Sequence, residues 1–168
     1  MHNESAKILI LDHEEKARHP VYHNVSYRQM LSQTIFGAAP RGDCKYSYRF
    51  TEVISRGAIP VYMGDNYVFP FLPEVAPWED CAVILPERDV HHVLQVLKGI
   101  RVEEQCRRRQ VCHQIYKQYM ETSVGVMDGL VQSLYRVAVK EKRGLPRLPL
   151  SGYHCTPDPT NPQWCNNV

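Results

Sequence analysis

Short, mainly apolar segments alternate with longer amphipathic ones along this chain of 168 residues. Segments with the length and composition of strands occupy residues 7–11, 35–39, 58–62 and 81–85. Strands that are apolar at consecutive positions are typical of a parallel sheet, whose strands are buried on both faces. Their alternation with helices indicates βαβ units. The pattern therefore predicts an α/β fold with a Rossmann-like, mostly parallel sheet flanked by helices.

The longer segments carry apolar residues three and four positions apart, as helices do. Ser26 and Ser47 are predicted N-caps, the first of a helix that extends to about Thr34. The second helix is predicted over residues 48–56, and Gly57 is well placed to end it. Three more helices are expected over residues 89–98, 103–119 and 123–140. The last is strongly amphipathic, with an apolar stripe that comprises Val124, Met127, Val131, Leu134 and Ala138.

The length of the chain fits one domain with a buried core. We place this domain at residues 1–144 and interpret residues 145–168, which are rich in Pro and lack periodicity, as an irregular tail. A net charge of +2 does not predict a nucleic-acid partner. Neither a membrane span nor a signal peptide is recognisable. The chain is therefore expected to be cytosolic or to lack a preceding segment.

The cysteines and basic residues support limited expectations. Six cysteines are too scattered for a metal site of the CxxC kind. A disulfide between Cys155 and Cys165 is plausible in an oxidising compartment, with which sequons at Asn3 and Asn24 agree. The basic residues 107–109 are interpreted as an ion-paired helix face with the neighbouring glutamates Glu103 and Glu104. The histidines are interpreted as exposed bystanders rather than as a base or metal ligands, namely His13, His19, His23, His91 and His92.

Candidate chemistry lies at the start of the helix predicted after Ser47. Free N–H groups and the helix dipole make such an end an anion site, suited to a diphosphate. Arg49, in the first turn, could bind phosphate oxygens, or it could form an ion pair with Glu52 three residues later. Glu52 could accept hydrogen bonds from ribose hydroxyls, or it could be an ordinary exposed glutamate. The spacing of these residues leaves both alternatives open.

The same residues belong to a series of motifs. IFGAAPRG at residues 35–42 is followed by SYRFTEVI at 47–54, GAIPV at 57–61, Asp65 and the pair PF at 70–71. In their order and gaps over about residues 27–90, these motifs resemble the exostosin family. The resemblance implies the carboxyl-terminal, donor-binding half of a GT-B glycosyltransferase. By position, it implies contacts to the nucleotide sugar for Arg41, Gly42, Lys45, Ser47, Arg49, Glu52 and Asp65.

The resemblance also implies an activity. Family members transfer a sugar with inversion from a nucleoside-diphosphate sugar, here expected to be a UDP-sugar, to a glycan or glycoprotein acceptor, without a metal or other cofactor. It implies the Golgi or endoplasmic reticulum lumen, with attachment to the membrane only through a preceding anchor. No residue of this chain is identified as the catalytic base, and the half present here is not expected to catalyse alone.

Departures from the family pattern keep a second hypothesis open. Residues 43–46, Asp-Cys-Lys-Tyr, replace a more basic run that contains glycine, and Gly37-Ala38-Ala39 replaces the family's Cys-Leu. These changes bear on the identity of the donor. The alternative is a non-catalytic module of the same fold that binds a nucleotide or a glycan. A dehydrogenase or a kinase is disfavoured because neither GxGxxG nor a P-loop motif occurs.

Overall fold

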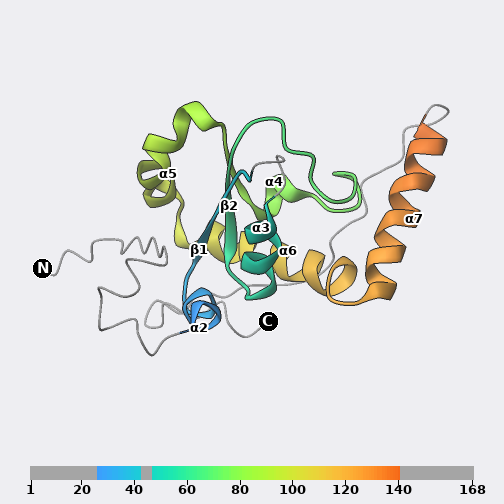
Figure 1. Ribbon diagram of the computed structural model, residues 1–168, viewed down its shortest axis with the longest axis horizontal. Coiled ribbons are helices and arrows are strands. Elements are labelled where there is room, and N and C mark those ends of the chain that lie inside the picture. Colours follow the sequence, from blue (N-terminus) through green and yellow to red (C-terminus); the bar gives the residue numbers. More distant parts are fainter. Residues whose placement is uncertain (1–25, 43–46, 141–168) are drawn as a thin grey trace, which may run out of the picture.

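The computed structural model describes residues 26–42 and 47–140 (Figure 1). Within these residues, three parallel strands lie side by side in the order β1 (Phe36–Pro40), β2 (Ile59–Met63) and β3 (Val83–Leu85). Phe36 pairs with Ile59, and Val61 pairs with Val83. The prediction of an α/β, Rossmann-like parallel sheet is confirmed. The strand predicted at residues 7–11 lies outside the described residues.

Helices fill most of the remaining described chain. They are α2 (Tyr27–Ser32), α3 (Tyr48–Ser55), α4 (Trp78–Cys81), the 3-10 helix η2 (Glu87–His92), α5 (Val93–Gly99), α6 (Val102–Tyr119) and α7 (Ser123–Lys140). The helix expected over residues 89–98 is divided between η2 and α5, and the single turn of α4 was not predicted. Gly57, with a φ of 75°, ends α3 as expected. The Ser26 hydroxyl accepts a hydrogen bond from the Gln29 N–H in a capping box.

The two faces of the sheet pack against different helices. On one face, Phe50 and Ile54 of α3 join Ile115 and Tyr119 of α6 in the larger core cluster. On the other face, β2 and β3 pack against α5 and the turn that follows it. Among the three described strands, only the central strand β2 is buried on both faces, as its continuously apolar sequence predicts. In β1 and β3, buried and exposed positions alternate.

Aromatic side chains fix the Pro-rich segment between β2 and α4. Phe50 of α3 lies 5.3 Å from Phe69 and 5.1 Å from Trp78, measured between ring centroids. The indole N–H of Trp78 donates a hydrogen bond of 2.6 Å to the carbonyl of Pro70. Phe71, with a φ of 63°, lies 5.7 Å from the ring of Tyr119. The segment is therefore part of the core although it forms no regular element.

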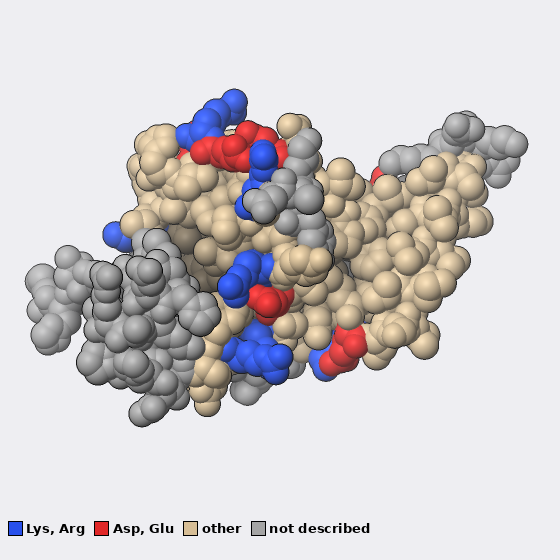
Figure 2. Space-filling view, in the orientation of Figure 1, with Lys and Arg blue, Asp and Glu red and all other residues tan. Residues whose placement is uncertain are grey.

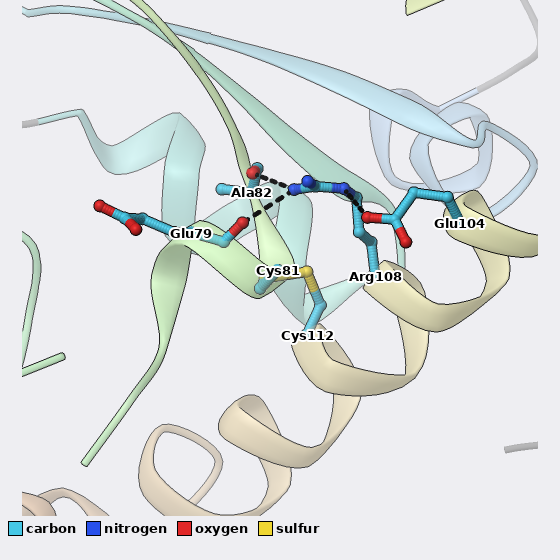
Figure 3. Close-up of a disulfide and its surroundings, with 6 residues drawn as sticks. All are labelled: Glu79, Cys81, Ala82, Glu104, Arg108 and Cys112. Carbon is cyan, nitrogen blue, oxygen red and sulfur yellow. Dashed lines mark hydrogen bonds and ion pairs between the residues drawn. A yellow bond between two sulfur atoms is a disulfide. The ribbon is translucent and has the colours of Figure 1, made fainter. Parts of the chain in front are cut away.

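A disulfide joins Cys81 of α4 to Cys112 of α6, with the two Cα atoms 4.8 Å apart (Figure 3). Cys106, six residues before Cys112 on α6, is also disulfide-bonded. The bond between Cys81 and Cys112 was not predicted from the sequence. The predicted pair Cys155 and Cys165 lies outside the described residues.

The helix α7 lies at one end of the molecule, on the side opposite α5 (Figure 1). Its predicted stripe is apolar but not buried: the exposed fractions of Val124, Met127 and Leu134 are 80%, 59% and 68%. The visible surface over α7 is almost free of charged side chains (Figure 2). Among the described helices, none combines the length and the apolar character that a bilayer crossing needs.

Candidate functional site

The loops that leave the three strands meet at the carboxyl edge of the sheet. Arg41 follows β1, and its N–H donates to the carbonyl of Met63 at 2.8 Å. Gly64 follows β2, and its N–H donates to the carbonyl of Leu85 at 3.0 Å. A Cβ on Gly64 would lie 2.7 Å from the Cβ of Arg41, so this approach of two loops requires glycine. Ligands of parallel α/β sheets bind at this edge.

Three charged residues meet there, one from each strand end. A guanidinium N–H of Arg41 donates to a carboxylate oxygen of Glu87 at 2.9 Å. The carboxylate of Asp65 accepts a hydrogen bond from the Glu87 N–H at 3.4 Å. The fold thus brings the predicted Arg41 and Asp65 to one place. Glu87 was missed by the sequence analysis because it lies 46 residues from its partner and in no recognised motif.

The Tyr62 side chain lies beneath these charges. Its hydroxyl is buried and makes no hydrogen bond with any residue that the structure describes. Burial raises the pKa of Tyr62, and the charge of Arg41 opposes this shift. A buried hydroxyl without a partner is uncommon in folded proteins and is costly where no water or ligand satisfies it. Tyr62 is therefore an additional polar group at this edge that the sequence analysis did not identify.

The second group of predicted residues lies on α3. A guanidinium N–H of Arg49 donates to a carboxylate oxygen of Glu52 at 3.0 Å, and both side chains are about half exposed. The guanidinium carbon also lies 4.5 Å from the ring centroid of Tyr27 on α2. Of the two alternatives that the spacing left open, the ion pair is the one seen here. A half-exposed pair contributes at most about 1 kcal/mol, so an incoming anion can replace the carboxylate at little cost.

The N terminus of α3 lies at the carboxyl edge of the sheet because α3 starts after the loop that leaves β1. Ser47 occupies the N-cap position and is buried, but its hydroxyl makes no capping hydrogen bond. The predicted cap is therefore correct in position and wrong in its hydrogen bonding. Gly42 follows Arg41 in the sequence, at the start of the loop between β1 and α3. Lys45 lies outside the described residues.

The basic residues 107–109 behave in two ways. Arg107 and Arg108 both pair with Glu104, at 2.7 and 2.8 Å, and Arg108 also donates to the carbonyls of Glu79 and Ala82 (Figure 3). Hydrogen bonding to Arg107 lowers the pKa of Glu104, against the effect of burial. The prediction of an ion-paired face is confirmed for these two arginines. It is wrong for Arg109, which pairs with no carboxylate of the described residues because it projects from a different face of α6.

Metal-binding side chains are dispersed. In residues 26–42 and 47–140, no three His, Cys, Asp or Glu side chains are placed to hold a metal ion. His91 and His92 are exposed, with ring centroids 4.0 Å apart. His13, His19 and His23 lie outside the described residues.

Comparison with known proteins gives a consistent result. The sequence model described as the exostosin GT47 domain matches residues 1–100, more than half of the chain. An exostosin-1 homolog of Caenorhabditis elegans is 24% identical over 115 residues, which are 68% of this chain and 30% of that protein. A probable beta-1,4-xylosyltransferase of Arabidopsis thaliana is 33% identical over 89 residues, 53% of this chain and 21% of that protein.

Exostosin-1 of Bos taurus is 29% identical over 101 residues, which are 60% of this chain and 13% of that protein. The chain thus spans at most 30% of the length of these relatives. The region of similarity includes the strand ends and the start of α3 that form the carboxyl edge of the sheet. On the match of its first 100 residues, the chain belongs to the exostosin family.

Proposed function

We propose that this chain is the donor-binding half of an inverting glycosyltransferase. It would bind a nucleoside-diphosphate sugar, with UDP as the nucleotide, for transfer to a glycan or glycoprotein acceptor. The observation that carries the proposal is the position of the family motifs: they lie where the strand ends and the N terminus of α3 meet. The names of the relatives, which include a probable xylosyltransferase and a probable glucuronosyltransferase, support glycosyl transfer.

The ion pairs at this edge suggest how a diphosphate would be bound. Arg49 would exchange Glu52 for phosphate oxygens, beside the free N–H groups and positive dipole of the α3 N terminus. Glu52, released in the same event, would accept hydrogen bonds from the ribose hydroxyls. In the same way, Arg41 would exchange the carboxylate of Glu87 for phosphate oxygens. We assign Lys45, Ser47 and Gly42 to the same phosphate-binding loop, and Asp65 to the sugar side of the pocket.

These groups would also assist the reaction. When the sugar is transferred, negative charge develops on the leaving diphosphate, and Arg49 and the dipole of α3 would stabilise it. Transfer with inversion further requires a base at the acceptor hydroxyl. We propose that this base and the acceptor site belong to a second Rossmann-like domain, as in a GT-B enzyme.

We infer that the protein works in the lumen of the Golgi or the endoplasmic reticulum. The disulfide between Cys81 and Cys112 supports this inference, since structural disulfides persist in oxidising compartments and are rare in the cytosol. Labelling of free thiols in protein isolated without reductant tests it. Because both side chains are buried, the protein is unfolded before labelling, and Cys81 and Cys112 should then resist alkylation until a reductant is added.

Calorimetric titration of UDP into the purified chain tests the proposed site. Replacement of Arg49 by Ala should raise the Kd for UDP by about 10- to 100-fold, because a charge-assisted contact contributes about 1.5–3 kcal/mol. Arg101→Ala is the matched control: Arg101 is exposed, precedes α6 and belongs to neither group of site residues. An unchanged Kd for Arg49→Ala would refute the assignment. Folded wild-type protein that binds no UDP would favour a non-catalytic module.

A further inference from the structure

A pocket lies at the other end of α3, away from the candidate donor site. The pocket has a volume of about 450 Å³ and is formed by the carboxyl-terminal ends of α2 and α3 and one face of α6. Arg49 and Ser55 mark the two sites on the same helix, and their positions differ by roughly 9 Å along the helix axis at 1.5 Å per residue. The pocket is therefore separate from the carboxyl edge of the sheet.

The pocket contains more cations than the carboxylates of the described residues balance. Arg109 projects from α6 to within 3.5 Å of the position that a Cβ on Gly57 would take. Neither Arg109 nor the adjacent Arg56 forms an ion pair or a side-chain hydrogen bond in the part of the chain that the structure describes. The carboxylate of Glu121 in the pocket is already paired with Lys117, at 2.6 Å. Two guanidinium charges thus face the pocket with no counter-charge from residues 26–42 or 47–140.

The surroundings of Arg109 make this excess charge unfavourable without a ligand. Burial lowers the pKa of Arg109, which means that its charge has lost part of its hydration without gaining a counter-charge. Burial, Lys117 and Arg109 together lower the pKa of His113 on the same face, against the opposing effect of Glu121. The pocket therefore has a positive potential in which an oxyanion is favoured.

Hydroxyl groups on the pocket wall define the rest of the ligand. The Ser55 hydroxyl donates to the carbonyl of Glu52 at 2.7 Å, and the Ser32 hydroxyl donates to the carbonyl of Gln29 at 2.8 Å. Each hydroxyl has therefore used its proton and presents lone pairs that accept hydrogen bonds. A ligand that fits this wall has hydroxyl donors next to an oxyanion, a combination that an acidic sugar provides.

We propose that this pocket binds an acidic sugar unit of a glycan, with its carboxylate or sulfate on Arg56 and Arg109 and its hydroxyls on Ser32 and Ser55. A planar guanidinium binds either oxyanion through two parallel hydrogen bonds. The assignment of the ligand as a glycan rests on the proposed function. Its assignment as an oxyanion rests on the charges of the pocket alone. The pocket would hold a glycan chain at a distance from the donor, so that it acts in binding and not in chemistry.

Calorimetry on the full chain tests the proposal with four probes: a disaccharide that contains a uronate, a sulfated neutral disaccharide, the unmodified neutral disaccharide and inorganic sulfate. Both acidic disaccharides should bind at least about tenfold more tightly than the neutral one. Whichever binds more tightly identifies the preferred oxyanion. Equal affinity for acidic and neutral disaccharides would overturn the proposal. Inorganic sulfate that binds as tightly as the sulfated disaccharide would show that the sugar makes no contact, and would overturn it as well.

Variants separate this site from the donor site. Arg109→Met, which keeps the length of the side chain, should weaken binding of the acidic disaccharides by about tenfold or more, and Arg109→Lys should restore part of the loss. Arg101→Met controls for the overall charge, and an equal loss in that variant would refute a specific site. Arg49→Ala should weaken UDP binding only. If UDP fails to bind while the disaccharides still depend on Arg109, the donor assignment fails and the pocket stands.

Discussion

Two helices of equal length, α6 and α7, meet the body of the protein in opposite ways. Each has 18 residues, and α7 is the more apolar and the more clearly amphipathic of the two. Yet α6 buries Cys112, Ile115 and Tyr119 in the larger core cluster, whereas Leu134 of α7 is 68% exposed. The amphipathic pattern shows that a helix has an apolar face. It does not show what that face contacts.

The contacts of α7 with the body are made by its small and polar residues. Gly129 lies against Phe71, where an added Cβ would come within 2.7 Å of the ring. The hydroxyl of Ser133 accepts a hydrogen bond of 3.1 Å from the Leu72 N–H. The face that packs inward is thus the less apolar one. The helix α6 buries apolar residues despite its weaker amphipathic pattern, because the disulfide to α4 and the contacts of the larger core cluster fix its orientation.

The largest expected effect on stability is at Ile115 in α6. Its side chain is 1% exposed, so replacement by Ala should lower the free energy of unfolding by about 4 kcal/mol through lost burial and a cavity. Urea unfolding with an unchanged dependence on denaturant would measure this loss. Ile115→Val is the matched control, with an expected loss of about 1 kcal/mol. Equal losses for the two variants would argue against a tightly packed site.

Removal of the disulfide should have the next largest effect. Cys81 and Cys112 are 31 residues apart, and a cross-link over a loop of this size stabilises a protein by about 3.5 kcal/mol, mainly by restricting the unfolded chain. The double variant Cys81→Ser, Cys112→Ser should lose this amount in thermal or urea unfolding. Reduction of the wild-type protein should destabilise it at least as much. A double variant as stable as wild type would show that the bond does not hold α4 against α6.

The smallest expected effect is at Leu134 in α7. Its exposed side chain loses little contact when it is shortened, so Leu134→Ala should change the free energy of unfolding by less than about 0.5 kcal/mol. The comparison with Ile115→Ala is direct, since both changes remove large aliphatic side chains from helices of the same length. A loss of 2 kcal/mol or more at Leu134, roughly the lower limit for a core position, would mean that the stripe is buried in solution.

The sequence by itself determined the local structure and the family. Strand and helix periods, the N-cap at Ser26 and the motif around Arg49 depend on neighbours within a few residues, so they can be read along the chain. For Arg49, the i,i+3 spacing allowed both an ion pair and a phosphate contact, because both use the same face of the helix. Local spacing limits the alternatives but does not choose between them.

Only the tertiary structure decided which distant residues meet. Arg41 pairs with Glu87 because the parallel sheet aligns the ends of β1 and β3, although these residues are far apart in the chain. Arg109 faces a pocket because α6 crosses the end of α3, while the two arginines that precede it in the sequence pair with Glu104. The partner of a charge or of an apolar face depends on how whole elements pack, and no local period in the sequence records that arrangement.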